Sequence, residues 1–324
     1  MVWTGAFFAL AAGLMWGLVF VLPLWWPEVP AAQLAFGRYL AFGLIALPLA
    51  WLDRRRLAGL TRADWREALR LSLVGNVLYY LLLASAIQRA GAPLPTVIIG
   101  TLPVVIALVS NRRNAARDGL FPWHRLALPL ALIAVGIALV NEAELRALAH
   151  DPAADLGRYV SGAALAVGAM ACWTWYPLRN ADWLRAHPDR SPRTWATAQG
   201  LATLLPALLG TLALFAWGRL GDGTASPALG PDPWAFVGSL LIVAVLSSWL
   251  ATVCWNEASQ RLPSTLAGQL IVFETLAALA YAYLLRGTWP DALTLGGIAL
   301  LVTGVVAALR VKPRPMSAAD AERA

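Results

Sequence analysis

The chain has 324 residues, of which 59% are hydrophobic and 13% are charged, and its mean hydropathy is +0.64. Soluble domains carry about 25% charged residues, so a soluble globular class is excluded. The net charge of +7 comes with a pI near 10, but short basic loops beside a bilayer explain this balance better than a nucleic-acid interface does.

Apolar segments follow one another along the whole chain. A hydrocarbon core about 30 Å thick requires roughly 20 apolar residues per helix. Ten segments approach this length, at 4–23, 31–51, 68–88, 94–110, 124–140, 159–177, 195–217, 233–255, 265–285 and 290–309. The sequence therefore predicts an all-α integral membrane protein with ten transmembrane helices.

The first apolar segment is expected to stay in the protein. It lacks a basic region before it, and bulky Trp25 and Trp26 stand where a signal peptide would need small residues for cleavage. Both cysteines, Cys172 and Cys254, fall inside apolar segments, so they are expected to act as small buried hydrophobes rather than as a disulfide.

The loops differ sharply in charge. With ten helices, the loops on the side of both termini hold 19 of the 25 basic residues, and the loops on the other side hold five. Basic loops stay in the cytoplasm. Both termini are therefore predicted to be cytoplasmic, in a multi-pass protein of the cell inner membrane.

The two halves of the sequence echo each other weakly but in the same order. Ala86-Ile87-Gln88-Arg89 resembles Ala258-Ser259-Gln260-Arg261, and Leu94-Pro95-Thr96 resembles Leu262-Pro263-Ser264. Five helices per half would place the second half upside down, as in alternating-access transporters whose substrate site lies between the repeats. We expect one repeat at 1–145, an inverted repeat at 155–312 and a cytoplasmic tail at 313–324.

Three stretches carry a family resemblance, namely Gly13-Leu14-Met15-Trp16-Gly17, Phe273-Glu274-Thr275-Leu276-Ala277-Ala278 and Gly297-Ile298-Ala299-Leu300-Leu301-Val302-Thr303-Gly304-Val305. Over essentially its whole length the chain resembles the ten-helix, EamA-like branch of the drug/metabolite transporter superfamily. Within that branch it is most similar to the YddG-type exporters of aromatic amino acids. It departs at Thr275, where many members carry proline. The resemblance implies a central cavity lined by helices 1–4 and 6–9, with helices 5 and 10 peripheral.

Two charged residues, Arg38 and Glu274, lie deep inside the apolar segments rather than near their ends. Deep charges are costly in hydrocarbon and usually face the bundle interior. Arg38, in the second segment, is expected to attract a substrate carboxylate or to position a gate. Two structural alternatives remain open, in which Arg38 snorkels outward or pairs with Glu274 of the ninth segment.

Aromatic and amide side chains recur at helical spacing in several segments, as Asn76, Tyr79 and Tyr80 do. Such a set suits a flat, largely apolar solute, and ordinary packing is the alternative. The predicted cavity residues are Trp16, Phe20, Arg38, Asn76, Tyr79, Tyr80, Trp173, Tyr176, Trp249, Thr252, Trp255 and Gln269. Residues with a predicted gating or structural role are Gly17, Pro103 and Glu274.

The sequence offers no pattern for a cofactor or for catalysis. Its three histidines lack metal-ligand spacing, and no phosphate-binding loop is present. The leading hypothesis is a transporter, not an enzyme, that exports aromatic or hydrophobic amino acids by alternating access. A broad drug or metabolite exporter and an intramembrane transferase are the alternatives. The expected partners are a small-molecule substrate and membrane lipid, with no nucleic acid, and a monomer fits the sequence.

Overall fold

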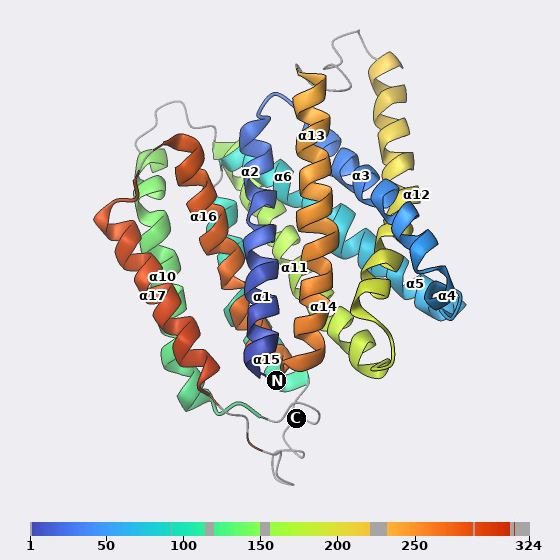
Figure 1. Cartoon of the computed structure of the whole chain (residues 1–324). Helices are drawn as coiled ribbons and strands as arrows, with labels where there is room; N and C mark the ends of the chain where they lie inside the picture. The colour runs from blue at the N-terminus through green and yellow to red at the C-terminus, as the bar shows by residue number, and fades with distance from the viewer. Residues whose placement is uncertain are drawn as a thin grey trace.

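The computed structural model describes residues 2–91, 93–113, 120–149, 156–220, 232–287, 289–311 and 314. Within these ranges every regular element is a helix, apart from one isolated β-bridge between Leu120 and Arg314. Except for Arg314, the predicted tail 313–324 lies outside the described residues. The start of the first helix (Val2–Trp16) and the end of the last helix (Ala292–Leu309) lie at the same end of the molecule (Figure 1).

The first part of the chain, up to residue 149, forms helices separated by short turns. They are α1 (Val2–Trp16), α2 (Leu18–Trp25), α3 (Ala31–Leu52), α4 (Arg54–Leu57), α5 (Arg62–Leu71), the π-helix η1 (Ser72–Leu78), α6 (Tyr79–Ala90), α7 (Pro93–Gly100), α8 (Leu102–Arg113) and α10 (Trp123–Ala149).

The second part begins at residue 156 and has a similar order of elements. They are α11 (Leu156–Ala186), α12 (Pro192–Leu220), α13 (Pro233–Val243), the π-helix η2 (Ala244–Leu250), α14 (Ala251–Arg261), α15 (Ser264–Leu270), α16 (Val272–Arg286) and α17 (Ala292–Leu309).

Seven helices among the described residues are long and apolar enough to cross a bilayer. They span Val2–Trp25, Ala31–Leu52, Arg62–Ala90, Leu94–Asn111, Pro192–Trp217, Pro233–Arg261 and Ser264–Leu285. Two shorter apolar helices cover Trp123–Leu139 and Ala292–Ala308, and the 31-residue α11 contains the segment predicted at 159–177. The chain is thus a multi-pass helical membrane protein, and the count of ten transmembrane helices stays a prediction.

Local sequence signals explain several helix boundaries. A capping box at Thr61 and Asp64 begins α5, because each side chain bonds the other residue's backbone N–H. Asp232 and Asp291 cap α13 and α17 in the same way as N-cap acceptors. Gly287 follows α16 with φ 64°, in the left-handed region that favours glycine.

Helices from the two parts of the chain pack against one another throughout the bundle. The most extensive contact joins α10 with α17, and this pair stands to one side of the bundle (Figure 1). The next most extensive contacts join α3 with α12, α6 with α11, α1 with α14, and α8 with α15. Between α10 and α17, a Cβ atom at Gly136 would lie 2.7 Å from the Gly297 carbonyl oxygen, so glycine permits the close approach.

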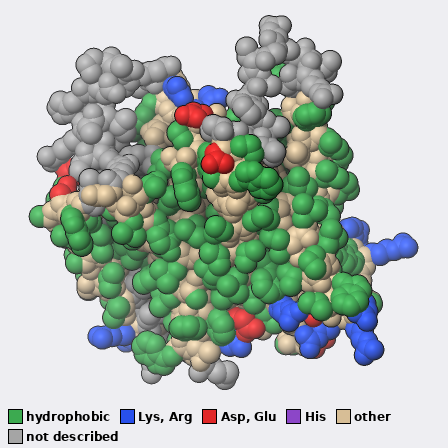
Figure 2. All heavy atoms as spheres, turned by 45° about the horizontal axis from the view of Figure 1, so that its top comes forward, with side chains coloured by type: hydrophobic (Ala, Val, Ile, Leu, Met, Phe, Trp, Pro, Cys, Tyr) green, Lys and Arg blue, Asp and Glu red, His purple; other side chains and the backbone are tan. Residues whose placement is uncertain are grey.

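The outside of the bundle is suited to lipid. Figure 2 shows a broad apolar face with Lys and Arg side chains gathered along its lower edge. On α12, side chains spaced at three to four residues are exposed, at Leu205, Leu208, Leu209 and Leu212. In water such a stripe would be costly, whereas in hydrocarbon it is the expected surface.

Several predicted helices are interrupted in the middle. The 4–23 segment breaks at Gly17, the 94–110 segment at Thr101 and the 265–285 segment at Ile271. The break at Thr101 precedes Pro103, which has no backbone N–H to continue the ladder. The break at Ile271 occurs although Thr275 replaces the family's proline. Apolar length alone contains no signal for such breaks. Two of the residues with a predicted gating or structural role, Gly17 and Pro103, nevertheless lie at or beside them.

Candidate substrate-binding site

An enclosed cavity lies at the centre of the bundle, close to these interruptions. Its walls come from α1, α2, α3, η1, α6, α11, η2, α14 and α16. The lining residues are Trp16, Val19, Arg38, Tyr39, Asn76, Tyr79, Trp173, Tyr176, Ser247, Ser248, Thr252 and Glu274. The cavity volume is about 10 Å³, enough for about one water molecule. The bundle is therefore contracted around this site.

Two π-helices bring polar groups to the cavity. Asn76 lies in η1, and Ser247 and Ser248 lie in η2. A π-helix widens the turn and leaves backbone carbonyls without their usual partners, and such bulges are frequent at functional sites. Here the Ser247 carbonyl accepts a hydrogen bond from Arg38 Nη2 at 3.5 Å.

Arg38 of α3 points into the bundle, where only 3% of it is exposed. Its Nε donates to Ser248 Oγ at 3.0 Å, and its guanidinium lies 4.6 Å from the Tyr80 ring centroid and 4.9 Å from that of Tyr39. These contacts are cation–π interactions of a desolvated arginine. Arg38 does not snorkel outward in this conformation.

Glu274 supplies a buried carboxyl group to the cavity wall. It is 1% exposed, and one carboxylate oxygen accepts from Trp173 Nε1 at 3.1 Å. It lies in the first turn of α16, directly after the break at Ile271, where the helix dipole favours an anion. Among the ion pairs of the described residues, none joins Glu274 to Arg38.

Aromatic rings form the wall between these charges. Trp173 stacks on Tyr79 at 4.5 Å and on Tyr176 at 5.2 Å, and Trp16 meets Trp173 edge-on at 4.9 Å. Offset and edge-on rings at these spacings attract one another. The same faces could hold a flat apolar side chain in their place.

Among the described residues, Arg38 Nη1 is a buried polar atom at the cavity that lacks a hydrogen-bond partner. The Tyr79 hydroxyl lies beside the Glu274 carboxyl group. Trp255 Nε1 and both amide atoms of Gln269 are likewise unpartnered. Buried polar groups are nearly always satisfied, so unpartnered donors beside a cavity indicate a place for a bound solute.

The structure brings eight of the predicted residues to this cavity. They are Trp16, Arg38, Asn76, Tyr79, Trp173, Tyr176, Thr252 and Glu274. Phe20, Tyr80, Trp249, Trp255 and Gln269 do not line it. Trp255 packs behind Trp16 at 5.3 Å, the Tyr80 hydroxyl donates to the Val19 carbonyl, and Trp249 Nε1 donates to Thr197.

Gly17 and Gly13 have a packing role in this structure. A Cβ atom at Gly17 would lie 2.7 Å from Ala277 Cβ, and one at Gly13 would lie 3.0 Å from the Glu274 backbone nitrogen. Glycine thus lets the first helix touch the start of α16, at the level of the cavity. Sequence reasoning did not select Tyr39 or Ser247, because neither shares a regular helical face with the residues that were chosen.

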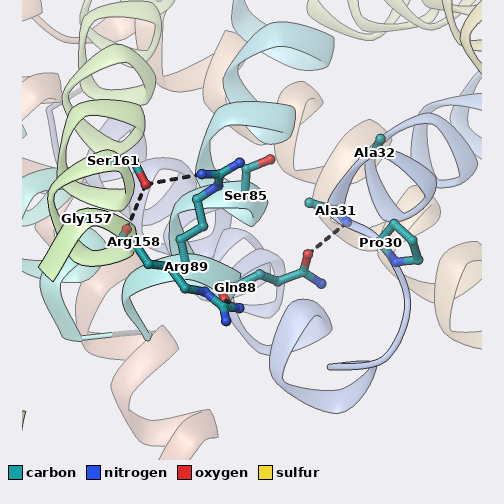
Figure 3. Close-up of a pocket in the computed structure, with 9 residues that line it drawn as sticks. All are labelled: Pro30, Ala31, Ala32, Ser85, Gln88, Arg89, Gly157, Arg158 and Ser161. Atoms are coloured by element: carbon teal, nitrogen blue, oxygen red, sulfur yellow. Dashed lines mark hydrogen bonds between the residues drawn. The ribbon is translucent and has the colours of Figure 1, made fainter. Parts of the chain in front are cut away.

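A hydrogen-bonded closure lies at the end of the molecule away from the N-terminus. Gln88 of α6 accepts from the Ala31 N–H at 2.9 Å and donates to the Val29 carbonyl at 2.7 Å, so it holds the α2–α3 turn. Arg158 donates to the Gln88 carbonyl, and Arg89 donates to Ser161. These residues border an open pocket of about 730 Å³ between α6, α11 and the turn (Figure 3).

Removing the Gln88 amide is expected to loosen this closure. A Gln88→Leu variant keeps the side-chain size but loses both bonds to the α2–α3 turn, each worth about 1 kcal/mol. With Cys172 and Cys254 replaced by alanine, a cysteine introduced at Ser85 should react several-fold faster with a membrane-impermeant maleimide. Gln260→Leu is the matched control, since the one bond that its amide makes among the described residues is 3.4 Å long and lies at the opposite end of the bundle. An unchanged labelling rate would contradict this role of Gln88.

The end that carries the termini is closed by charged pairs between the two parts of the chain. Arg179 of α11 pairs with Glu67 of α5 at 2.6 Å, and Arg193 lies 3.5 Å from Asp53. Closer to the core, Ser110 of α8 and Thr265 of α15 share a buried hydrogen bond of 2.8 Å. The cavity is therefore shut off at both ends.

A multi-pass helical bundle with an enclosed, partly charged cavity at its centre defines the class of membrane transporters. The sequence profile of the EamA-like transporter family matches residues 3–141. An inner membrane protein of Escherichia coli K12, YtfF, is 52% identical over 98% of this chain and 99% of its own length. The chain belongs to the EamA-like transporter family, and the prediction of a membrane transporter is confirmed.

More distant relatives agree with this assignment. The threonine/homoserine exporter RhtA of Escherichia coli K12 is 30% identical over 87% of this chain and 79% of its own length. A transporter of Archaeoglobus fulgidus is 24% identical over 94% of this chain and 92% of its own length. One solved crystal structure shares the fold with a TM-score of 0.68 at 17% identity, and the alignment covers 95% of this chain and 97% of the other.

Proposed function

We propose that this transporter exports amino acids from the cytoplasm by alternating access. The observation that carries the proposal is the enclosed cavity, in which aromatic rings flank one buried guanidinium group and one buried carboxyl group. A small solute with an apolar side chain and a charged head group would fit these walls once the helices move apart. Both closed ends described above are places where the bundle could open.

Matching irregularities in the two parts of the chain support the proposed inverted repeat. The π-helix Ser72–Leu78 precedes α6, and the π-helix Ala244–Leu250 precedes α14, which has the same place in the second part. The breaks at Thr101 and Ile271 correspond in the same way. Two repeats of five helices, at 1–145 and 155–312, would orient the basic loops and both termini toward the cytoplasm.

The aromatic walls favour aromatic or hydrophobic side chains in the substrate, as the YddG-type resemblance implies. RhtA is named for threonine and homoserine, which are small and polar, so the panel of substrates must include both kinds. A broader drug or metabolite exporter is the second candidate, because stacked rings recognise flat solutes with little selectivity.

Counterflow in proteoliposomes tests the proposal. Liposomes loaded with an unlabelled amino acid should accumulate the same labelled amino acid from outside, with phenylalanine, tryptophan and leucine compared against threonine and homoserine. We expect accumulation of at least one of them above protein-free liposomes. Absence of counterflow across the whole panel would overturn amino-acid export. Equal counterflow of unrelated aromatic cations would favour the broader exporter.

A further inference from the structure

We propose that the cavity selects the zwitterionic head group of an α-amino acid, with Arg38 binding the carboxylate and Glu274 binding the ammonium group. This inference rests on the amino-acid export proposed above, and it names the chemical group of the substrate that the same site recognises. The apolar side chain of the substrate would then lie against Trp173 and its neighbouring rings.

Arg38 retains a donor edge for a carboxylate. Its Nε and Nη2 bond to η2, whereas Nη1 is buried without a partner. A carboxylate has two oxygens that accept hydrogen bonds, and its bond to a guanidinium is charge-assisted and strong. A substrate carboxylate could therefore satisfy Arg38 Nη1.

Glu274 retains acceptor capacity for an ammonium group. An ionised carboxylate offers about four lone-pair positions. Trp173 Nε1 donates to one oxygen of Glu274, and the Tyr79 hydroxyl lies beside the same carboxyl group, so acceptor positions remain. The position of Glu274 in the first turn of α16 is one where the helix dipole stabilises a negative charge. A cationic group entering the cavity is thus the natural counterpart of this carboxylate.

Arg38 and Glu274 lie apart in the cavity, and this separation favours a solute that carries both a carboxylate and an ammonium group. Arg38 and Glu274 are 3% and 1% exposed and line one cavity, but no ion pair joins them in the described structure. Buried charges are stabilised by partners of opposite sign. A solute with only one charge would leave the other residue uncompensated, whereas an α-amino acid compensates both.

Arg38 and Glu274 also come from different parts of the chain, on α3 and α16. A bound zwitterion would therefore join the two halves through its head group. Because the cavity now holds only about one water molecule, the substrate must enter a widened form of it. The halves could then close again around the bound head group.

Competition between analogues tests the proposal on the unmodified protein. Counterflow of labelled phenylalanine is measured with phenylalanine, phenethylamine and 3-phenylpropionate as competitors, which differ only in head-group charge. We expect the amine and the acid each to compete at least 10-fold more weakly than the amino acid. Threonine, 1-aminopropan-2-ol and 3-hydroxybutanoate form the matched set if threonine is the better substrate. Equal competition within both sets would overturn zwitterion selection.

Variants then assign each charge to its partner. Glu274→Gln should weaken phenylalanine competition at least 10-fold and leave that of 3-phenylpropionate unchanged. Arg38→Gln should also weaken phenylalanine competition at least 10-fold, but it should leave the competition by phenethylamine unchanged. Glu274→Asp and Arg38→Lys keep the charge and should retain part of the selectivity. If Glu274→Gln and Arg38→Gln fold but weaken competition by all three ligands equally, the assignment would be contradicted. Export of amino acids without head-group selectivity would refute this inference alone, whereas no amino-acid counterflow at all would refute the proposed function.

Discussion

Oxidation of a Ser110→Cys/Thr265→Cys double variant is expected to stop export, and reduction is expected to restore it. The two hydroxyl oxygens lie 2.8 Å apart and are buried between α8 and α15, which belong to the two parts of the chain. A disulfide has an S–S length of about 2.05 Å, so small side-chain rotations should allow the bond to form. The link would fix the closed end that carries the termini.

Alternating access requires this end to open. If the halves rock about the cavity, a covalent link between α8 and α15 should lower counterflow at least 10-fold. The measurement is counterflow in proteoliposomes after treatment with an oxidant and again after dithiothreitol, with Cys172 and Cys254 replaced by alanine. Each single cysteine variant, treated identically, is the control. Full activity in a quantitatively cross-linked sample would contradict opening between these helices.

Asn180→Leu is expected to destabilise the fold more than most single substitutions. The Asn180 side chain is buried and joins three helices, because it accepts from Trp195 and Gln199 and donates to Asn256 at 2.7 Å. Leucine would leave these three partners unsatisfied, and each buried unsatisfied group costs about 1–3 kcal/mol. We therefore expect a loss of about 3 kcal/mol or more in the free energy of unfolding.

Unfolding in mixed detergent micelles, titrated with a denaturing detergent, measures this loss. Thr203→Val is the matched control, since it removes only a bond to the Gln199 carbonyl within α12, and that carbonyl still accepts from Ser72. We expect the control to cost less than half as much. Equal destabilisation by the two variants would mean that the network around Asn180 adds little.

The sequence predicted the membrane class and the positions of most helices because apolar length follows directly from bilayer thickness. It also identified Arg38 and Glu274, since charged residues stand out in apolar segments. It did not predict the π-helices, because a widened turn leaves no composition signal in Ser72–Leu78 or Ala244–Leu250.

Contacts between distant parts of the chain were equally invisible to sequence reasoning. Asn180 was not selected, although its partners make it the centre of a buried network. Phe20 and Tyr80 were selected for the cavity wall, but they pack behind it. A shared helical face predicts which way side chains point, and it does not predict how far they lie from the cavity. Tyr39 lines the cavity next to Arg38, although the two residues are neighbours in the continuous helix α3.

The contracted cavity bears on how well the membrane retains its proton gradient. A space of about 10 Å³, closed at both ends, holds no file of water molecules along which protons could hop. The transporter in this conformation is therefore an electrical insulator. Many copies could stand in the membrane without dissipating the proton gradient, and permeability would arise only during the brief intervals when a solute is carried across.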